Sequence, residues 1–235
     1  MIRQRADFFV IGTDTGVGKS LVAAALLRHL GQESGRRTVG MKPVAAGTDW
    51  VNGRWCNDDV EMLNAASNVQ APSAWVCPYL LREAIAPHIA AEHENITLRL
   101  GHLEACFTQL QTMSDSVVVE GAGGFIVPLN ATETLADLAK ALALPVVLVV
   151  GLRLGCLNHA LLTAQAIRQA GLSLAGWVAN HIDPEMPALA ENIAALTLRL
   201  DAPCWAQIPW QGAVLAAGNL PHVQFTLPLF EALPL

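Results

Sequence analysis

The chain has 235 residues, of which 53% are hydrophobic and 14% charged, and its formal net charge is −6. This length and composition suit one buried core, and we expect residues 1–235 to form a single domain. No cluster of Lys and Arg is present, which argues against nucleic acid or an anionic membrane as a partner. The five cysteines form no C-x-x-C pair, and the first residues lack a signal-peptide pattern, so we expect a cytoplasmic protein with reduced thiols.

Apolar runs of strand length alternate with helical patterns along the chain. The predicted strands cover 8–11, 38–41, 117–119, 146–150 and 174–179, with 75–80 and 204–208 as further candidates. The predicted helices cover 21–30, 98–110, 135–142, 157–170 and 188–200, and residues 48–57 are expected to form a long loop. This alternation is typical of βαβ units, so we predict an α/β fold with a doubly wound, mostly parallel sheet.

A glycine-bearing motif, Gly-Thr-Asp-Thr-Gly-Val-Gly-Lys-Ser, follows the first strand at residues 12–20. Its end matches the phosphate-loop pattern G-x-x-x-x-G-K-[ST], although Gly12 stands one residue too early for that pattern. Gly16 and Gly18 allow close backbone approach to phosphates, Lys19 can neutralise their charge, and the Ser20 hydroxyl can ligate Mg²⁺. The motif predicts a nucleotide site; the alternative is a plain glycine turn that starts a helix.

Three charged residues follow predicted strands or loops further along the chain. Glu120 ends a buried strand and should face the same crevice as Lys19, because ligands of open α/β sheets lie beyond the carboxyl ends of the strands. Lys42 follows the strand at 38–41, where it could stabilise a transferring phosphoryl group. Asp59 precedes a helical pattern and could reach a metal. The alternatives are a turn-capping Glu, a solvated Lys and a helix-capping Asp.

The strand at 174–179 is followed by Asn-His-Ile-Asp, which is distantly similar to the guanine-reading tetrad N-K-x-D. His181 replaces the lysine of that tetrad, so we expect no guanine specificity and regard Asn180 as a candidate contact for adenine. The seven histidines form no H-x-x-x-H or H-E-x-x-H pair, and no G-x-S-x-G motif is present. A zinc site and a serine hydrolase are therefore not expected.

Six motifs together carry a resemblance to a known family; they cover residues 12–20, 41–47, 119–124, 155–160, 176–180 and 208–210. With these motifs in this order, the chain resembles the dethiobiotin synthetases from about residue 8 to about residue 212. The resemblance implies a P-loop nucleotide hydrolase-like fold and an ATP- and Mg²⁺-dependent ligase of biotin synthesis. In that family an amino group of 7,8-diaminopelargonate takes up CO₂ as a carbamate, ATP phosphorylates the carbamate, and the second amine closes the cyclic urea.

The resemblance also implies roles for individual residues. The catalytic residues would be Lys19, Lys42 and Thr15, and the Mg²⁺ ligands would be Ser20, Asp59 and Glu120. The nucleotide would contact Gly16, Val17, Gly18, Lys19, Ser20, Leu21, Asp59, Glu120, Gly121, Ala122, Gly123, Asn180, His181, Pro209, Trp210 and Gln211. The substrate would contact Lys42, Ala46, Gly155, Cys156, Leu157 and Asn158. The family forms homodimers whose substrate site spans two subunits.

Four positions depart from the common family pattern. Ala46 replaces a Ser, Ile85 and Ala86 replace Thr and Ser, and Gly16 replaces a residue with a side chain. A paralogue that acts on a related diamine therefore stays open as an alternative. A nucleotide-switch ATPase of the partition or division-site kind is a second alternative, but those proteins carry a second lysine where this chain has Asp14. A GTP-dependent metallochaperone is a third, which the lack of His/Cys clusters disfavours.

Overall fold

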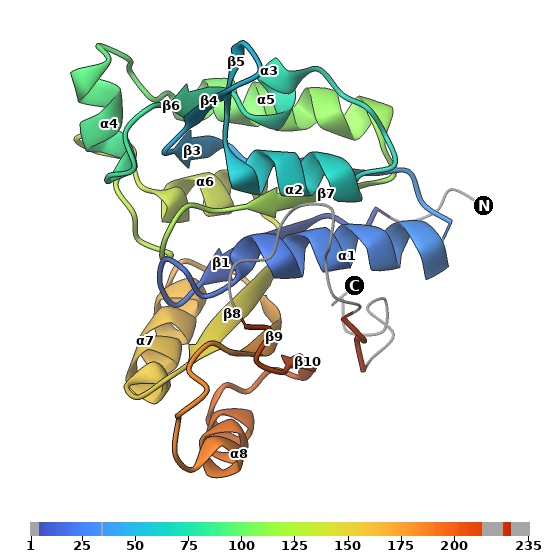
Figure 1. Ribbon diagram of the computed structural model, residues 1–235, viewed down its shortest axis with the longest axis vertical. Helices are drawn as coiled ribbons and strands as arrows, with labels where there is room; N and C mark the ends of the chain where they lie inside the picture. The colour runs from blue at the N-terminus through green and yellow to red at the C-terminus, as the bar shows by residue number, and fades with distance from the viewer. Residues whose placement is uncertain (1–4, 34, 213–222, 227–235) are drawn as a thin grey trace.

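The computed structural model describes residues 5–33, 35–212 and 223–226. A parallel six-stranded sheet in the order β10-β9-β8-β1-β7-β2 forms its centre (Figure 1). The strands are β1 (Phe8–Gly12), β2 (Thr38–Met41), β7 (Ser116–Glu120), β8 (Val146–Leu152), β9 (Leu174–His181) and β10 (Cys204–Ile208). The predicted α/β class with a mostly parallel sheet is confirmed.

Helices cover both faces of this sheet (Figure 1). One face carries α1 (Lys19–Glu33) and α2 (Asp58–Ala66), whose buried apolar residues, except Val60, join one cluster. The other face carries α5 (Leu100–Met113), α6 (Leu135–Leu142), α7 (Cys156–Gln169) and α8 (Leu189–Arg199), whose buried residues join a second cluster. The five long helices predicted from the sequence are all present, with boundaries that differ by up to three residues.

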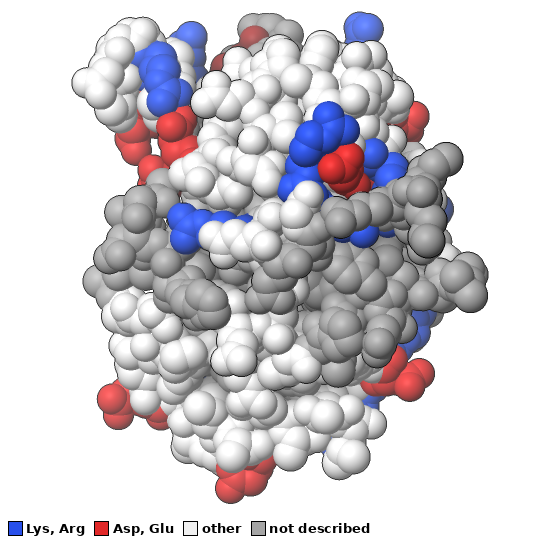
Figure 2. All heavy atoms as spheres, turned by 90° about the vertical axis from the view of Figure 1, so that its right-hand side faces the viewer, with Lys and Arg blue, Asp and Glu red and all other residues white. Residues whose placement is uncertain are grey.

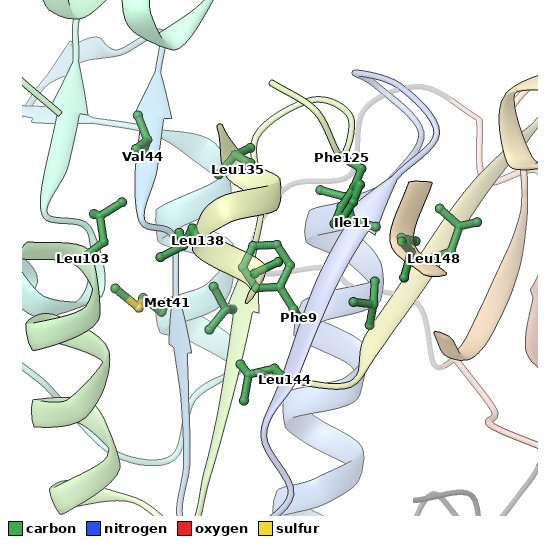
Figure 3. Close-up of a cluster of buried hydrophobic side chains, with 14 of the residues drawn as sticks. Phe9, Ile11, Met41, Val44, Leu103, Phe125, Leu135, Leu138, Leu144 and Leu148 are labelled. Carbon is green, nitrogen blue, oxygen red and sulfur yellow. The ribbon is translucent and has the colours of Figure 1, made fainter. Parts of the chain in front are cut away.

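Strand β1 is fully buried because it packs against helices on both sides. Phe8 and Val10 belong to the cluster beneath α1, whereas Phe9 and Ile11 belong to the cluster on the opposite face. Figure 3 shows Phe9 and Ile11 in the same apolar layer as Leu138 of α6. Successive side chains of a strand point to opposite faces, so a strand covered on both faces needs a continuous apolar run. This explains why the run is not amphipathic.

Two sequence predictions for the segment between β2 and α4 (Pro87–His93) were wrong. Residues 48–57 form a hairpin of β4 (Asp49–Val51) and β5 (Arg54–Cys56), not a long loop. Its turn is Asn52-Gly53, in which both residues have positive φ (50° and 80°), as a two-residue hairpin turn requires. The strand expected at 75–80 is instead the short helix α3 (Ser73–Val76) followed by β6 (Tyr79–Leu81). Strand β6 pairs in parallel with β3 (Val44–Ala46).

Charged groups are sparse on the surface. On the face drawn in Figure 2, the described Lys and Arg residues form small groups that lie among Asp and Glu, without a broad basic area. Within the described residues, the helices are too short or too polar to cross a bilayer. The small number of charged groups agrees with the composition, in which 14% of the residues are charged.

Candidate active site

A cleft of about 940 Å³ opens at the carboxyl ends of the central strands. The predicted site residues that line it are Thr15, Gly16, Gly18, Lys19, Ser20, Leu21, Lys42, Ala46, Asp59, Glu120, Ala122, Gly123, Asn180, His181, Trp210 and Gln211. The predicted site residues outside its lining are Val17, Gly121, Pro209, Gly155, Cys156, Leu157 and Asn158. Most of the residues expected around a nucleotide therefore share one cleft, whereas the segment expected to bind the substrate's carboxylate does not reach it within this chain.

The phosphate loop joins β1 to α1 and is fixed to the end of β9. Gly16 and Gly18 have φ values of 73° and 88°, which residues with a side chain rarely adopt. The Asn180 side-chain amide donates a 2.9 Å hydrogen bond to the Val17 carbonyl oxygen. A Cβ atom on Gly18 would lie 2.2 Å from Asn180 Nδ2, so glycine is required there for this close approach. The Asn180 contact with the loop was not anticipated from the sequence.

Lys42 lies between two carboxylates at the bottom of the cleft. Its Nζ atom is 2.6 Å from Glu120 Oε1 and 2.8 Å from Asp59 Oδ2. Lys42 and Glu120 are buried, with exposed side-chain fractions of 3% and 0%. Burial acts to lower the pKa of Lys42, but the charges of Glu120 and Asp59 outweigh it and raise that pKa above its usual value. Lys42 is therefore a permanently charged group inside the cleft.

Ser20 connects the same two carboxylates to the phosphate loop. Its Oγ atom lies 2.5 Å from Asp59 Oδ1 and 2.8 Å from Glu120 Oε1. A hydroxyl has one hydrogen to donate, so it cannot satisfy both acceptors at once. Burial raises the pKa of Glu120, whereas at Asp59 the contacts with Lys42, Ser20 and Lys19 together outweigh burial and lower that pKa.

These oxygens fit a hard divalent cation. One hydroxyl and two carboxylates are the donor set that Mg²⁺ prefers, and Glu120 Oε2 is buried without a hydrogen-bond partner. The described residues contain no group of three or more His, Cys, Asp or Glu side chains that could hold a metal alone. A cation here would therefore also need oxygens from a ligand such as a phosphate.

Asp59 is available for these contacts because another residue caps its helix. The Asn57 side chain accepts hydrogen bonds from the backbone N–H groups of Asp59 and Val60, at the start of α2. The Asn57 amide also donates to the Gly47 carbonyl oxygen at 2.7 Å, which ties α2 to the end of β3. The interpretation of an aspartate as the helix cap was wrong, since Asn57 performs that role.

Lys19 is directed back onto its own loop. Its Nζ atom donates a 2.9 Å hydrogen bond to the Asp14 carbonyl oxygen, and only 7% of the residue is exposed. Burial, together with the nearby charge of Lys42, lowers the pKa of Lys19. Both lysines of the cleft are thus largely removed from solvent.

One wall of the cleft was predicted only in part, because Ala46 was expected to contact the substrate whereas Val44, Met62 and Val127 were not anticipated. It consists of Val44 and Ala46 on β3, Met62 on α2, Val127 and residues 84–87, which follow β6. The pairing of β3 with β6 places Ala46 beside the segment that contains Ile85 and Ala86. Positions 46, 85 and 86, at which this chain lacks the hydroxyls of the common family pattern, therefore share one apolar wall. The pairing of two three-residue strands carries no clear sequence signal, which is why the proximity of these positions was not predicted.

Comparison with known proteins gives consistent results. A family model described as an AAA domain matches residues 6–217. The chain is 49% identical over 221 residues to the ATP-dependent dethiobiotin synthetase BioD of Xanthomonas euvesicatoria pv. vesicatoria (strain 85-10), covering 94% of this chain and 98% of that protein. It is 50% identical over 202 residues to the protein of the same name from Aromatoleum aromaticum, covering 86% and 89%.

Solved structures of lower identity share the fold. The septum site-determining protein MinD from Pyrococcus horikoshii OT3, complexed with Mg-ADP, has a TM-score of 0.54 at 19% identity and covers 88% of this chain and 82% of its own. A ParA family ATPase from Chlorobium tepidum TLS also has a TM-score of 0.54, at 16% identity, and covers 89% and 86%. At these identities the similarity concerns the fold alone.

Proposed function

Because this chain belongs to the ATP-dependent dethiobiotin synthetase family, we propose that its cleft converts 7,8-diaminopelargonate and CO₂ to dethiobiotin with ATP, a step of biotin synthesis. The observation that carries this proposal is the position of Lys42, whose ammonium lies beside the phosphate loop and between the buried Glu120 carboxylate and the partly exposed Asp59 carboxylate. A desolvated cation at this place can hold an anionic carbamate against a nucleotide phosphate.

The phosphate loop is the proposed site for the ATP phosphates. Backbone N–H groups at the start of α1 and the Lys19 ammonium would neutralise them, because helix N-termini and cations favour anions. Lys19 would leave the Asp14 carbonyl oxygen to do so. Asn180, His181 and Trp210 line the same cleft and are proposed to surround the base.

The residues then act mainly by positioning and charge. A carbamate oxygen attacks the γ-phosphorus and ADP leaves, after which the second amine attacks the carbamate carbon and inorganic phosphate leaves. Lys42 would stabilise the negative charge on the carbamate and on the transferring phosphoryl group, and Thr15 would contact that group. Ser20, Asp59 and Glu120 would hold Mg²⁺, which supplies charge neutralisation at the phosphates.

A homodimer is part of the proposal. Residues 155–158 lie outside the cleft of their own chain, while the adjacent Leu154 has an exposed fraction of 90%. A large exposed apolar side chain beside an expected substrate-binding segment supports a contact with a second copy, which would bring residues 155–158 to the partner's cleft. Light scattering should give the mass of a dimer with and without nucleotide; a monomer would contradict this part. The cytoplasmic location stays a prediction from the sequence.

The function is tested by supplying the purified protein with 7,8-diaminopelargonate, bicarbonate, ATP and Mg²⁺, and measuring dethiobiotin by mass spectrometry. We expect dethiobiotin and ADP in equal amounts. ADP release without dethiobiotin, stimulated by DNA or by vesicles, would instead indicate a nucleotide switch.

The apolar wall that contains Ala46 and Ala86 favours a second candidate, a preference for a related diamine. Parallel reactions with diamines of different chain length separate the two, because a paralogue would convert one of them faster than 7,8-diaminopelargonate.

A further inference from the structure

An ion pair links the phosphate loop to the loop that precedes α7. The Arg153 guanidinium lies 2.5 Å from the carboxylate of Asp14, although the two residues are 139 positions apart in the sequence. Each side chain has an exposed fraction of 45%. The pair joins segments that follow β1 and β8, which are neighbours in the sheet. Nothing in the proposed chemistry uses it.

Asp14 also contacts two other groups of the phosphate loop. Its second carboxylate oxygen accepts a 2.7 Å hydrogen bond from the Thr15 backbone N–H. Its carbonyl oxygen accepts the Lys19 ammonium at 2.9 Å. A movement of Asp14 would therefore displace Thr15, and in the nucleotide-free protein it would also displace Lys19.

The backbone of Arg153 contacts the start of α7. Its carbonyl oxygen accepts a 3.0 Å hydrogen bond from the backbone N–H of Cys156, the first residue of that helix. The N-cap residue is Gly155, whose φ is 94° and which provides no side-chain cap. The turn that starts α7 is thus shaped by backbone contacts of Arg153, while the Arg153 side chain is held on the phosphate loop.

We propose that Asp14 and Arg153 are positioning residues that couple nucleotide binding to binding of the substrate's carboxylate by the segment 155–158. This inference rests on the proposed function, in which the phosphate loop binds ATP and residues 155–158 bind the anionic end of the substrate. When ATP orders the phosphate loop, the ion pair fixes the turn before α7, so less ordering remains for the second ligand. The coupling must be reciprocal, because it is a difference of binding free energies.

The size of the effect follows from the exposure of the pair. Solvent-exposed ion pairs contribute little, so we expect a coupling of about fivefold in Kd, which corresponds to about 1 kcal/mol. The pair should act on binding and leave the chemical step almost unchanged.

The test is a double-mutant cycle followed by calorimetry. Binding of 7,8-diaminopelargonate is measured with and without Mg²⁺ and a non-hydrolysable ATP analogue, for the wild type, Asp14→Asn, Arg153→Gln and the double variant. In the wild type the analogue should tighten diaminopelargonate binding about fivefold, and both single variants should lose most of this factor. The double variant should lose no more of the fivefold tightening than either single variant. Arg153→Lys should retain the fivefold tightening. In turnover, KM should rise while kcat changes little.

A matched control is the exposed pair Arg37–Asp115, with an N–O distance of 3.0 Å, which lies away from the cleft lining. Arg37→Gln should leave the coupling factor unchanged. The inference is overturned if Arg153→Gln keeps the wild-type factor, if the losses of the single variants add in the double variant, or if the wild type shows no coupling. Dethiobiotin formation by a wild type without coupling would separate this failure from a failure of the proposed function.

Discussion

The Lys42 ammonium lies 2.6 Å from the Glu120 carboxylate, although 78 positions separate the two residues. The sheet explains this proximity. Strands β2 and β7 are parallel neighbours in a register that pairs Met41 with Val119, so the next residue of each strand lies at the same edge. The carboxyl end of the sheet therefore brings a cation and an anion together without any local sequence signal.

Replacement of this lysine should separate binding from chemistry. We expect Lys42→Met to lower kcat by about 100-fold or more, because a preorganised charge at the transferring group is lost. Nucleotide binding, measured by calorimetry, should change by less than about tenfold, since Lys19 still binds the phosphates. Circular dichroism must show a folded variant, because the buried Glu120 carboxylate and the partly exposed Asp59 carboxylate both lose their partner. Lys140→Met, on the exposed face of α6, is the matched control, and turnover by Lys42→Met at the rate of this control would contradict the assigned role.

The Ser20 hydroxyl should set the metal requirement. We expect Ser20→Ala to raise the Mg²⁺ concentration for half-maximal turnover by about tenfold, which is equivalent to about 1.4 kcal/mol of lost binding. Removal of divalent cations with EDTA should abolish turnover in both proteins. Ser173→Ala, at an exposed position before β9, is the control. An unchanged Mg²⁺ dependence of Ser20→Ala would show that the hydroxyl is not a ligand.

Glycine 18 is required by a specific contact. In Gly18→Ala the new Cβ would meet the Asn180 amide at 2.2 Å, at a φ of 88° that alanine rarely adopts. We therefore expect ATP affinity to fall by about 100-fold or more, because the loop must move. Gly16 also has a positive φ, but a Cβ atom there would meet no atom within 4 Å. Gly16→Ala should therefore reduce ATP affinity less than Gly18→Ala. Gly101→Ala, in helix α5 with open space around it, should bind ATP like the wild type. Equal losses in the first two variants would argue against the Asn180 contact.

The thiol of Cys77 should be inert in the folded protein. Burial raises the pKa of Cys77 from 9.0 to about 12, so the folded state holds the proton that the unfolded state loses above pH 9.0. Its contribution to stability is therefore complete below pH 9.0 and decreases as the pH rises toward 12. Cys56 and Cys77 are both half-buried. At pH 8, iodoacetamide followed by mass spectrometry should nevertheless label Cys56 long before Cys77, because the raised pKa keeps the Cys77 thiol protonated. Rapid labelling of Cys77 without unfolding would contradict this.

The sequence predicted the central sheet well because its strands are buried on both faces. A run such as Phe8–Gly12 is apolar at every position except its terminal glycine, and only a covered strand needs that pattern. The phosphate loop was recognised because Gly18, Lys19 and Ser20 are adjacent in the chain. A motif of adjacent residues can be identified without knowledge of the tertiary structure.

The peripheral elements were predicted less well because their signals are short. Strands β3 and β6 have three residues each, too few for a periodic pattern, and they exist because they pair with each other. The hairpin at Asn52-Gly53 did carry a turn signal, but Gly53 and the Asn residues of this segment were interpreted as a long loop. The cap of α2 was assigned to the wrong side chain, since Asn57 and the aspartates after it are all good caps.

The sequence by itself determined the α/β fold, the phosphate loop and the resemblance to the dethiobiotin synthetases, because these depend on residues that are adjacent or regularly spaced. Only the tertiary structure decided that Lys42 lies between Asp59 and Glu120, that Asn180 holds the phosphate loop, and that residues 155–158 lie outside the cleft of their own chain. These relationships depend on strand order and register, which place residues more than 100 positions apart, such as Asn180 and Val17, within hydrogen-bond distance.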